Sequence, residues 1–121
     1  MQFEIPYPLS VNQYWRTVRG RIIISETGRR FRQSLKAHIH ELMYRKLVKP
    51  VVGPLKVEFL VSRPDNRRRD LDNLLKVTLD VMTHAGVWMD DSQIQDLRIS
   101  WRGPGDTVTV KIEEISDGRT D

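Results

Sequence analysis

The spacing of apolar residues alternates between two periods along this chain, and this alternation limits the folds that it can adopt. Apolar residues recur every three or four positions in two segments, which predicts amphipathic helices over 27–47 and 70–85. Five other segments alternate apolar with polar residues or are rich in β-branched residues, which predicts strands at 3–5, 21–25, 55–61, 97–101 and 108–112. The order ββαβαββ predicts an α+β fold in which two helices pack on a mixed sheet.

The length and the turn signals predict how these elements are organised. A chain of 121 residues can build one hydrophobic core but not two ordinary domains, so we predict a single domain over 1–121. Pro50 is expected to end the first helix and Gly86 to cap the second. The turn residues 103–106 predict that the last two strands pair as a hairpin. Residues 116–121 are expected to be a loose tail.

Two compositional absences narrow the chemistry and the location. The chain has no cysteine, which excludes disulfides, thiolate zinc sites and cysteine nucleophiles, so any metal must be held by oxygen or histidine. No apolar stretch approaches the length of a bilayer span, and the first residues lack the pattern of a secretion signal. We therefore expect a cytoplasmic protein without a membrane partner.

Charge is distributed unevenly along the chain. The whole sequence has a net charge of +4, but residues 1–50 contain ten Lys or Arg and three acidic residues, whereas residues 51–121 contain ten and thirteen. A basic face is typical of a nucleic-acid binder, because phosphates that it neutralises release their counterions. An ordinary solvated surface is the alternative, and composition alone does not decide between them.

The segment Arg67–Asn73 (sequence RRRDLDN) carries the strongest chemical signal. Its three arginines suit phosphates, and its two carboxylates, Asp70 and Asp72, suit Mg²⁺, which proteins hold with one or two carboxylates plus substrate phosphate. Lys76 lies four residues after Asp72, on the same helical flank, where it can orient water or neutralise transition-state charge. A second acidic pair, Asp90 and Asp91, follows the predicted helix. The pattern predicts a metal-dependent phosphodiester hydrolase.

Each of these charged residues also has an ordinary structural interpretation. Asp70 can be a helix N-cap, Lys76 can pair with Asp72 for only about 0.2 to 0.5 kcal/mol, and the Asp90–Asp91 pair can belong to a turn. Distance is a further constraint, because a helix of about 15 residues spans about 22 Å. Asp91 can approach Asp72 only if the helix is shorter, if the following loop folds back, or if Asp91 comes from a second copy of the chain.

Together with the motifs Asn12–Arg16, Arg19–Arg21, Ser25–Gly28 and Gly86–Asp91, the segment Arg67–Lys76 carries a family likeness. The chain resembles the RusA family of Holliday junction resolvases, which are small homodimeric Mg²⁺-dependent endonucleases that nick four-way DNA junctions symmetrically. The likeness runs from about residue 6 to residue 91. It implies that the chain is a homodimeric resolvase.

The residues and the resemblance together yield these expectations. Asp70, Asp72 and Asp91 would be metal ligands and catalytic residues, and Lys76 would be catalytic. The cofactor would be Mg²⁺, with Mn²⁺ as a candidate substitute, and the substrate would be branched double-stranded DNA. DNA contacts are expected from Arg16, Arg19, Arg21, Arg67, Arg68 and Arg69. Two alternatives stay open: a non-catalytic DNA-binding protein, and a nuclease for flaps or RNA.

Overall fold

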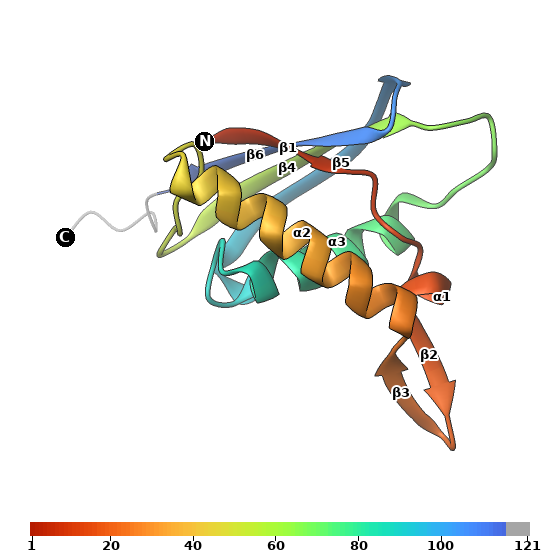
Figure 1. Cartoon of the computed structure of the whole chain (residues 1–121). Helices are drawn as coiled ribbons and strands as arrows, with labels where there is room; N and C mark the ends of the chain where they lie inside the picture. The colour runs from red at the N-terminus through yellow and green to blue at the C-terminus, as the bar shows by residue number, and fades with distance from the viewer. Residues whose placement is uncertain (116–121) are drawn as a thin grey trace.

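The computed structural model describes residues 1–115, so the predicted tail at 116–121 lies outside the described residues. Its main sheet has four strands, in the order β1 (Gln2–Pro6), β6 (Thr107–Glu114), β4 (Leu55–Arg63) and β5 (Ile94–Pro104). The pair β4–β5 is parallel and the other pairs are antiparallel. Two long helices, α2 (Glu26–Tyr44) and α3 (Leu71–Ala85), lie along one face of the sheet (Figure 1). The predicted α+β class is confirmed.

The core lies between this sheet face and the two helices. Alternate residues of β4 are buried because successive side chains of a strand point to opposite faces, and Phe59 at its centre is only 1% exposed. The helices supply the other half of the core through one stripe each. Its largest fully buried side chains include Trp88, Tyr14, Phe59, Ile5, Leu35, Ile39, Leu55 and Met82.

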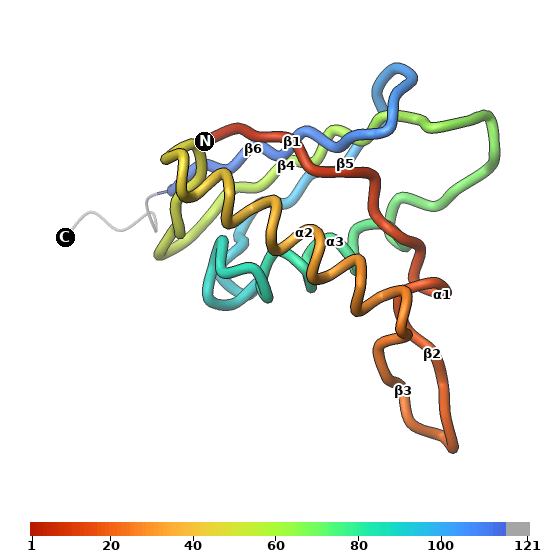
Figure 2. The backbone as a smooth tube through the Cα atoms, viewed as in Figure 1, coloured from red at the N-terminus to blue at the C-terminus, as the bar shows by residue number. Residues whose placement is uncertain are grey.

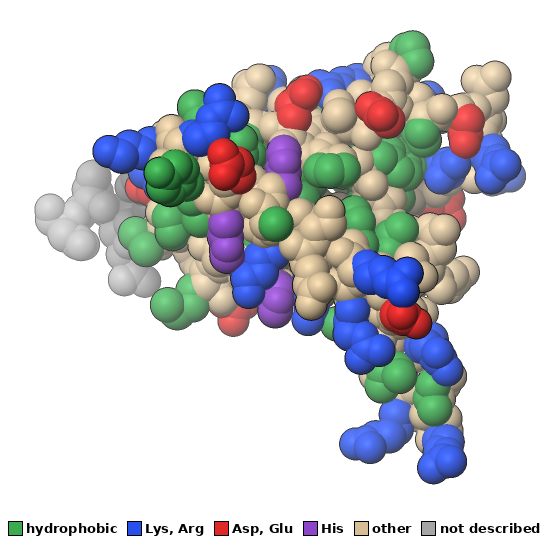
Figure 3. All heavy atoms as spheres, in the orientation of Figure 1, with side chains coloured by type: hydrophobic (Ala, Val, Ile, Leu, Met, Phe, Trp, Pro, Cys, Tyr) green, Lys and Arg blue, Asp and Glu red, His purple; other side chains and the backbone are tan. Residues whose placement is uncertain are grey.

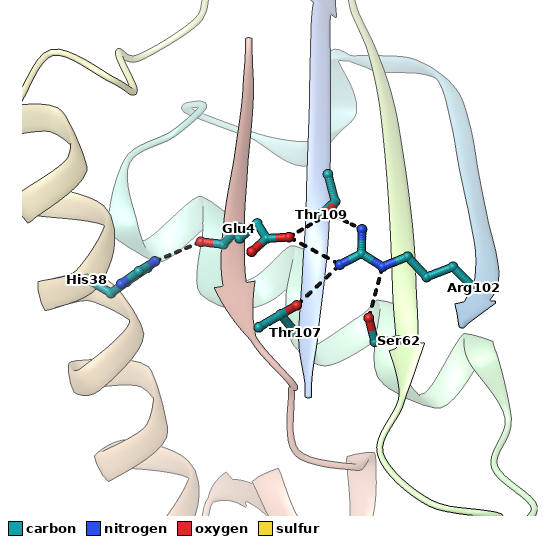
Figure 4. A network of polar contacts seen from close by, with 6 residues as sticks. All are labelled: Glu4, His38, Ser62, Arg102, Thr107 and Thr109. Carbon is teal, nitrogen blue, oxygen red and sulfur yellow. Dashed lines mark hydrogen bonds and ion pairs between the residues drawn. The ribbon is translucent and has the colours of Figure 1, made fainter. Parts of the chain in front are cut away.

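The opposite face of the sheet is polar, and one arginine ties its strands together (Figure 4). The Arg102 guanidinium on β5 donates hydrogen bonds to Ser62 Oγ on β4 at 2.9 Å and to Thr107 and Thr109 on β6. It also forms an ion pair with Glu4 on β1 at 3.2 Å. All four strands are thereby linked, so the sheet is a rigid platform for the helices above it.

The predicted hairpin between the last two strands is wrong. Strand β4 lies between β5 and β6 and pairs with both, so the turn after Pro104 passes over the end of β4 instead of joining neighbours. Gly105 N–H donates to the Arg63 carbonyl at 3.0 Å, and a Cβ at Gly105 would come within 3.0 Å of Ser62. The turn residues predicted a reversal correctly, but the pairing depends on a strand distant in sequence.

The predicted helix boundaries agree with the structure to differing degrees. The second predicted helix is confirmed as α3, which follows Asp70 and ends at Gly86, whose φ of 84° is the left-handed conformation that glycine favours. The first ends at Tyr44, six residues before Pro50, because Lys46 adopts a φ of 62° and the Leu47 N–H turns back to the Leu42 carbonyl. No helix within residues 1–115 has the length and apolar character that a bilayer crossing requires.

Residues 7–20, for which no helix or strand was predicted, contain two further elements. A short helix α1 (Val11–Tyr14) is capped by Ser10, and it leads directly into strand β2 (Trp15–Val18). Strand β2 pairs antiparallel with β3 (Arg21–Ile24), the second predicted strand. That strand therefore exists, but it does not join the main sheet.

We call the β2–β3 hairpin, residues 15–24, the arm. It projects from the body beyond the start of α2 (Figure 1). Arg19 and Gly20 form its two-residue turn, with φ values of 51° and 76°, as tight hairpin turns require. At its base, Ser25 donates from its N–H to the Tyr14 carbonyl at 2.8 Å. A Cβ at Gly28 would lie 2.4 Å from that carbonyl, so only glycine allows α2 to begin this close to the arm.

Candidate active site

Helix α3 presents its charged residues in one row. Asp72, Lys76 and Asp80 follow one another at four-residue spacing, so they lie on the same flank of the helix. Asp70 occupies the N-cap position, but its side chain makes no capping hydrogen bond. The N-cap interpretation therefore explains where Asp70 lies in the chain and leaves its carboxylate available for another ligand.

The loop after α3 folds back toward this row of residues. Asp91 begins the 3₁₀ turn η1 (Asp91–Gln93) and faces the middle of the helix across a hollow of about 410 Å³. We call this space the acidic hollow; its lining residues are Trp15, Lys76, Leu79, Asp80, Thr83, Met89, Asp90 and Asp91. The loop thus folds back and brings Asp91 near Lys76 within one chain, but Asp72 does not line this hollow.

Asp90 and Asp91 differ in their surroundings although they are neighbours. The Asp90 carboxylate accepts the Ser92 backbone N–H at 2.9 Å, while the Gln93 side chain accepts the Asp90 N–H at 3.1 Å. The hydrogen bonds from Ser92 lower the pKa of Asp90. Asp90 therefore caps the turn, and the neighbouring Asp91 lines the acidic hollow without a capping role.

Asp70 and Asp72 do not share the acidic hollow. Asp70 lines a separate hollow of about 410 Å³ with Ser10, Arg68, Arg69, Asn73 and Leu74. Asp72 is exposed and lines neither hollow. Within residues 1–115, no three His, Asp or Glu side chains lie close enough together to hold a metal ion. One copy of the chain thus brings Lys76 and Asp91 together and keeps Asp70 apart from them.

None of Asp70, Asp72 and Asp91 forms an ion pair with any residue in the range 1–115. Asp80 on the same helix shows the contrast, because its Oδ2 accepts the Tyr14 hydroxyl at 2.5 Å and the Arg32 guanidinium at 2.8 Å. The charge of Asp80 is therefore already balanced by the protein, while the three predicted ligands keep their charge for something else.

The Tyr14–Arg32–Asp80 network is a feature that sequence reasoning missed. Arg32 Nε also donates to the Tyr14 hydroxyl, at 2.9 Å, so α1, α2 and α3 meet at one point. Burial and the hydrogen bond to Asp80 raise the pKa of Tyr14 to about 12, so its hydroxyl remains a donor. The four-residue spacing from Lys76 to Asp80 places Asp80 on the same flank of the helix, but it does not indicate that Tyr14 and Arg32 bind it.

The predicted arginines 67–69 lie on the loop between β4 and α3, which Figure 2 shows as a wide excursion at the edge of the molecule. Asp65, which sequence reasoning also missed, accepts Arg69 at 2.6 Å and the Arg67 N–H at 2.9 Å. The Arg69 side chain, followed by the Arg67 N–H, lowers the pKa of Asp65. Arg69 is thereby held in place over the Tyr7 ring, at 5.4 Å from its centre. Arg67 is 83% exposed and lies 3.9 Å from the same Asp65 carboxylate.

The other predicted arginines all lie on the arm. Arg16 is on β2, Arg19 is in the turn and Arg21 begins β3, and all three are exposed. Basic side chains cluster toward the free end of the arm (Figure 3). The arm and the loop between β4 and α3 thus carry cationic groups on either side of the α3 carboxylates.

Carboxylates without ion pairs, flanked by cationic groups on exposed segments, are the groups that a protein acting on phosphodiesters would use. Comparison with known proteins agrees. The chain belongs to the endodeoxyribonuclease RusA family, whose model matches residues 6–113. A crossover junction endodeoxyribonuclease of Enterobacteria phage HK97 is 39% identical over 117 residues, which is 94% of each chain.

Further bacterial and phage relatives have the same name. A crossover junction endodeoxyribonuclease of Shigella sonnei (strain Ss046) is 41% identical over 95 residues, or 78% of this chain and 77% of the relative. One from Enterobacteria phage 82 has the same identity and coverage. The predicted family resemblance is confirmed, and the chain is an endonuclease of this family.

Proposed function

We propose that this protein resolves four-way (Holliday) DNA junctions by paired, symmetry-related nicks and that it requires Mg²⁺. The observation that carries the proposal is that the carboxylates of Asp70, Asp72 and Asp91 form no ion pair within residues 1–115. They belong to a chain whose relatives are named crossover junction endodeoxyribonucleases. The nicking reaction needs a site that holds anionic phosphate and activates water. Its substrate would be found in the cytoplasm.

The donor set suits the proposed metal. Asp70, Asp72 and Asp91 offer only carboxylate oxygens, which Mg²⁺ prefers, and Mn²⁺ is a candidate substitute. A bound Mg²⁺ would supply charge stabilisation at the scissile phosphate and a more acidic water. Lys76, on the wall of the acidic hollow, would place its ammonium against the phosphate and offset the charge that develops on it.

A second copy of the chain would complete each site. Within residues 1–115 of one copy, Asp70 and Asp91 line different hollows and no set of three ligands converges. We infer that Asp70 and Asp72 of one subunit hold the metal together with Asp91 of the other. A two-fold symmetric dimer then has two identical sites, which matches the two equivalent strands of a four-way junction.

DNA would be held by the arginines on both sides of the site. Arg16, Arg19 and Arg21 would contact phosphates along the arm, and Arg67 and Arg68 would do so from the loop before α3. Arg69 would act with less freedom, because Asp65 already fixes its guanidinium. These contacts are to phosphate, so they support binding to many sequences.

A substrate panel tests the proposed function. The protein is incubated with a four-way junction, a flap, a linear duplex and an RNA hairpin, with Mg²⁺ or with EDTA. We expect paired nicks in the junction, with Mg²⁺ only. Junction binding without cleavage in any metal would favour a non-catalytic DNA-binding protein, and preferential cutting of the flap or the hairpin would favour the second alternative.

Mixing two inactive variants tests the shared site. Asp72→Asn and Asp91→Asn should each abolish nicking and keep junction binding, whereas Asp106→Asn, in the exposed β5–β6 turn, should stay active. If the ligands come from both subunits, an equal mixture contains mixed dimers with one intact site each, and about a quarter of the wild-type sites return. These dimers nick one strand only. A mixture as inactive as its components would place all ligands in one subunit.

A further inference from the structure

A third hollow adjoins the acidic one, and it contains none of the proposed metal ligands. It has a volume of about 380 Å³, within the range of small-ligand pockets, and Trp15 and Lys76 border both spaces. We call it the apolar hollow. Trp15, Val11 and Ile22 supply its apolar surface, and Asn12, Thr17 and Arg16 are polar residues around it.

The aromatic wall of this hollow is held in a defined orientation. The Trp15 ring packs edge-to-face on Tyr14, with centroids 4.6 Å apart and planes at 87°. Tyr14 is itself fixed by its hydrogen bonds to Asp80 and Arg32. A partly exposed aromatic ring whose orientation is already set loses little side-chain entropy when a flat ligand stacks on it. The Tyr14–Arg32–Asp80 network thus fixes Tyr14, and Tyr14 in turn orients the Trp15 ring as a stacking surface.

The opposite wall is an aliphatic side chain left largely in solvent. Ile22 on β3 is 75% exposed and pairs with Thr17, so the two share the face of the arm that lines the hollow. Its neighbour Ile23 points to the other face of the arm and does not line the hollow, although Arg16, with which it pairs, reaches the hollow. An exposed isoleucine beside a tryptophan and two cations suits a ligand with a flat apolar surface and an attached anion.

We propose that the apolar hollow binds an unpaired nucleobase from the branch point of the DNA, stacked on Trp15 and covered by Ile22, while the adjoining phosphate lies at Lys76. This inference rests on the proposed function, because a branched substrate supplies bases that have lost a stacking neighbour. Extruding a base costs least where it is already unpaired or poorly stacked, so the hollow would select branched DNA over duplex. The arm would then distinguish branched DNA from duplex DNA as well as bind phosphates.

Binding of altered junctions tests the inference without cleavage. Affinity is measured in EDTA for a series of junctions, each with one abasic site within two nucleotides of the branch point. For the wild-type protein we expect one position at which the abasic site weakens binding by about tenfold, since stacking of one base on an aromatic side chain has about that value. Equal affinity for every junction in the series would overturn the proposal.

Two neighbouring isoleucines provide the protein side of the test. In Ile22→Ser the loss of affinity caused by the abasic site should fall below about twofold, because Ile22 no longer covers the base in the unmodified junction. In the matched control Ile23→Ser the tenfold penalty should persist. An unchanged penalty in Ile22→Ser, accompanied by a lower sedimentation mass, would mean that a second copy of the chain occupies the hollow, and this result would also overturn the proposal.

Fluorescence gives an independent readout at Trp15. Stacking of a base should quench Trp15 emission, and the quench should be absent in Trp15→Phe and at the sensitive abasic junction. The other two tryptophans, Trp88, which is buried, and Trp101, which is partly buried on β5 under the Arg63 guanidinium, should contribute a constant background. Failure of the wild-type protein to nick any junction in Mg²⁺ would reject the proposed function, whereas nicking without the quench or the abasic penalty would reject only the base pocket.

Discussion

The body and the arm of this protein are built on opposite principles. The body buries one face of β1, β4 and β6 under α2 and α3, and Arg102 links the strands on the opposite, polar face of the sheet. The arm, residues 15–24, is a two-stranded hairpin with exposed isoleucines and three arginines. A hairpin alone is marginally stable in water, so the arm depends on its attachment at Tyr14, Ser25 and Gly28.

This difference separates stability from recognition. The body can hold the α3 carboxylates in place because its core is packed, while the exposed arginines and isoleucines of the arm are available for the proposed contacts with DNA. The two regions meet at the Tyr14–Arg32–Asp80 network, which connects the arm to the helix that carries Lys76. Substitutions in the body, in the arm and at this junction should therefore have distinct effects.

The largest effect is expected from Phe59→Ala in the body. Phe59 is at the centre of β4 and 1% exposed, so its loss leaves a cavity and should lower the free energy of unfolding by about 3 to 5 kcal/mol. Ile23→Ala in the arm should change that free energy by no more than about 0.5 kcal/mol. Urea denaturation followed by tryptophan fluorescence measures both. Similar losses would show that the arm belongs to the core.

The next effect concerns binding by the arm. The double substitution Arg19→Ala and Arg21→Ala removes two exposed cations, so the slope of log affinity against log salt concentration should decrease by about 1.8 if both contact phosphates. The unfolding midpoint should stay the same. Titration of a labelled junction at several salt concentrations measures the slope. An unchanged slope with altered cut-site preference would mean that the arm reads bases instead.

A smaller effect is expected where arm and body meet. Tyr14→Phe removes the hydroxyl that donates to Asp80 and accepts from Arg32, and it should lower the free energy of unfolding by about 1 to 2 kcal/mol. The phenyl ring keeps the contact with Trp15, so the arm should remain folded. The free energy of unfolding and the affinity for a junction are both measured for Tyr14→Phe. A loss of stability alone means that the network only stabilises the fold, and an additional loss of affinity means that it also positions the arm.

The smallest effect is a pH dependence that originates at the same residue. The pKa of Tyr14 is raised to about 12, so the folded state favours the protonated phenol. Its contribution to stability is complete below pH 10, the ordinary pKa, and is lost as pH rises toward 12. Between these values the wild-type protein should lose stability more steeply than Tyr14→Phe. Parallel slopes in denaturation measurements at several pH values would contradict the assignment.

Local patterns were sufficient to predict most elements of the body. The alternation in β4 and the stripe of α3 indicate which side of each element is buried, and Gly86 identifies the end of α3 because few other residues adopt its conformation. The motif around Asp70 and Asp72 likewise predicted carboxylates at the start of a helix. These features depend on neighbours within a few positions, so the sequence alone reveals them.

Partners distant in sequence could be found only in the tertiary structure. The placement of β4 between β5 and β6 and the meeting of Tyr14, Arg32 and Asp80 both depend on residues far apart in the chain. The predicted strand at 21–25 also pairs with β2, which was not predicted, and not with the main sheet. Periodicity indicates the buried face of an element but not its neighbour. The sequence by itself therefore determined the elements and their chemistry, and packing decided which charges were balanced and which stayed free.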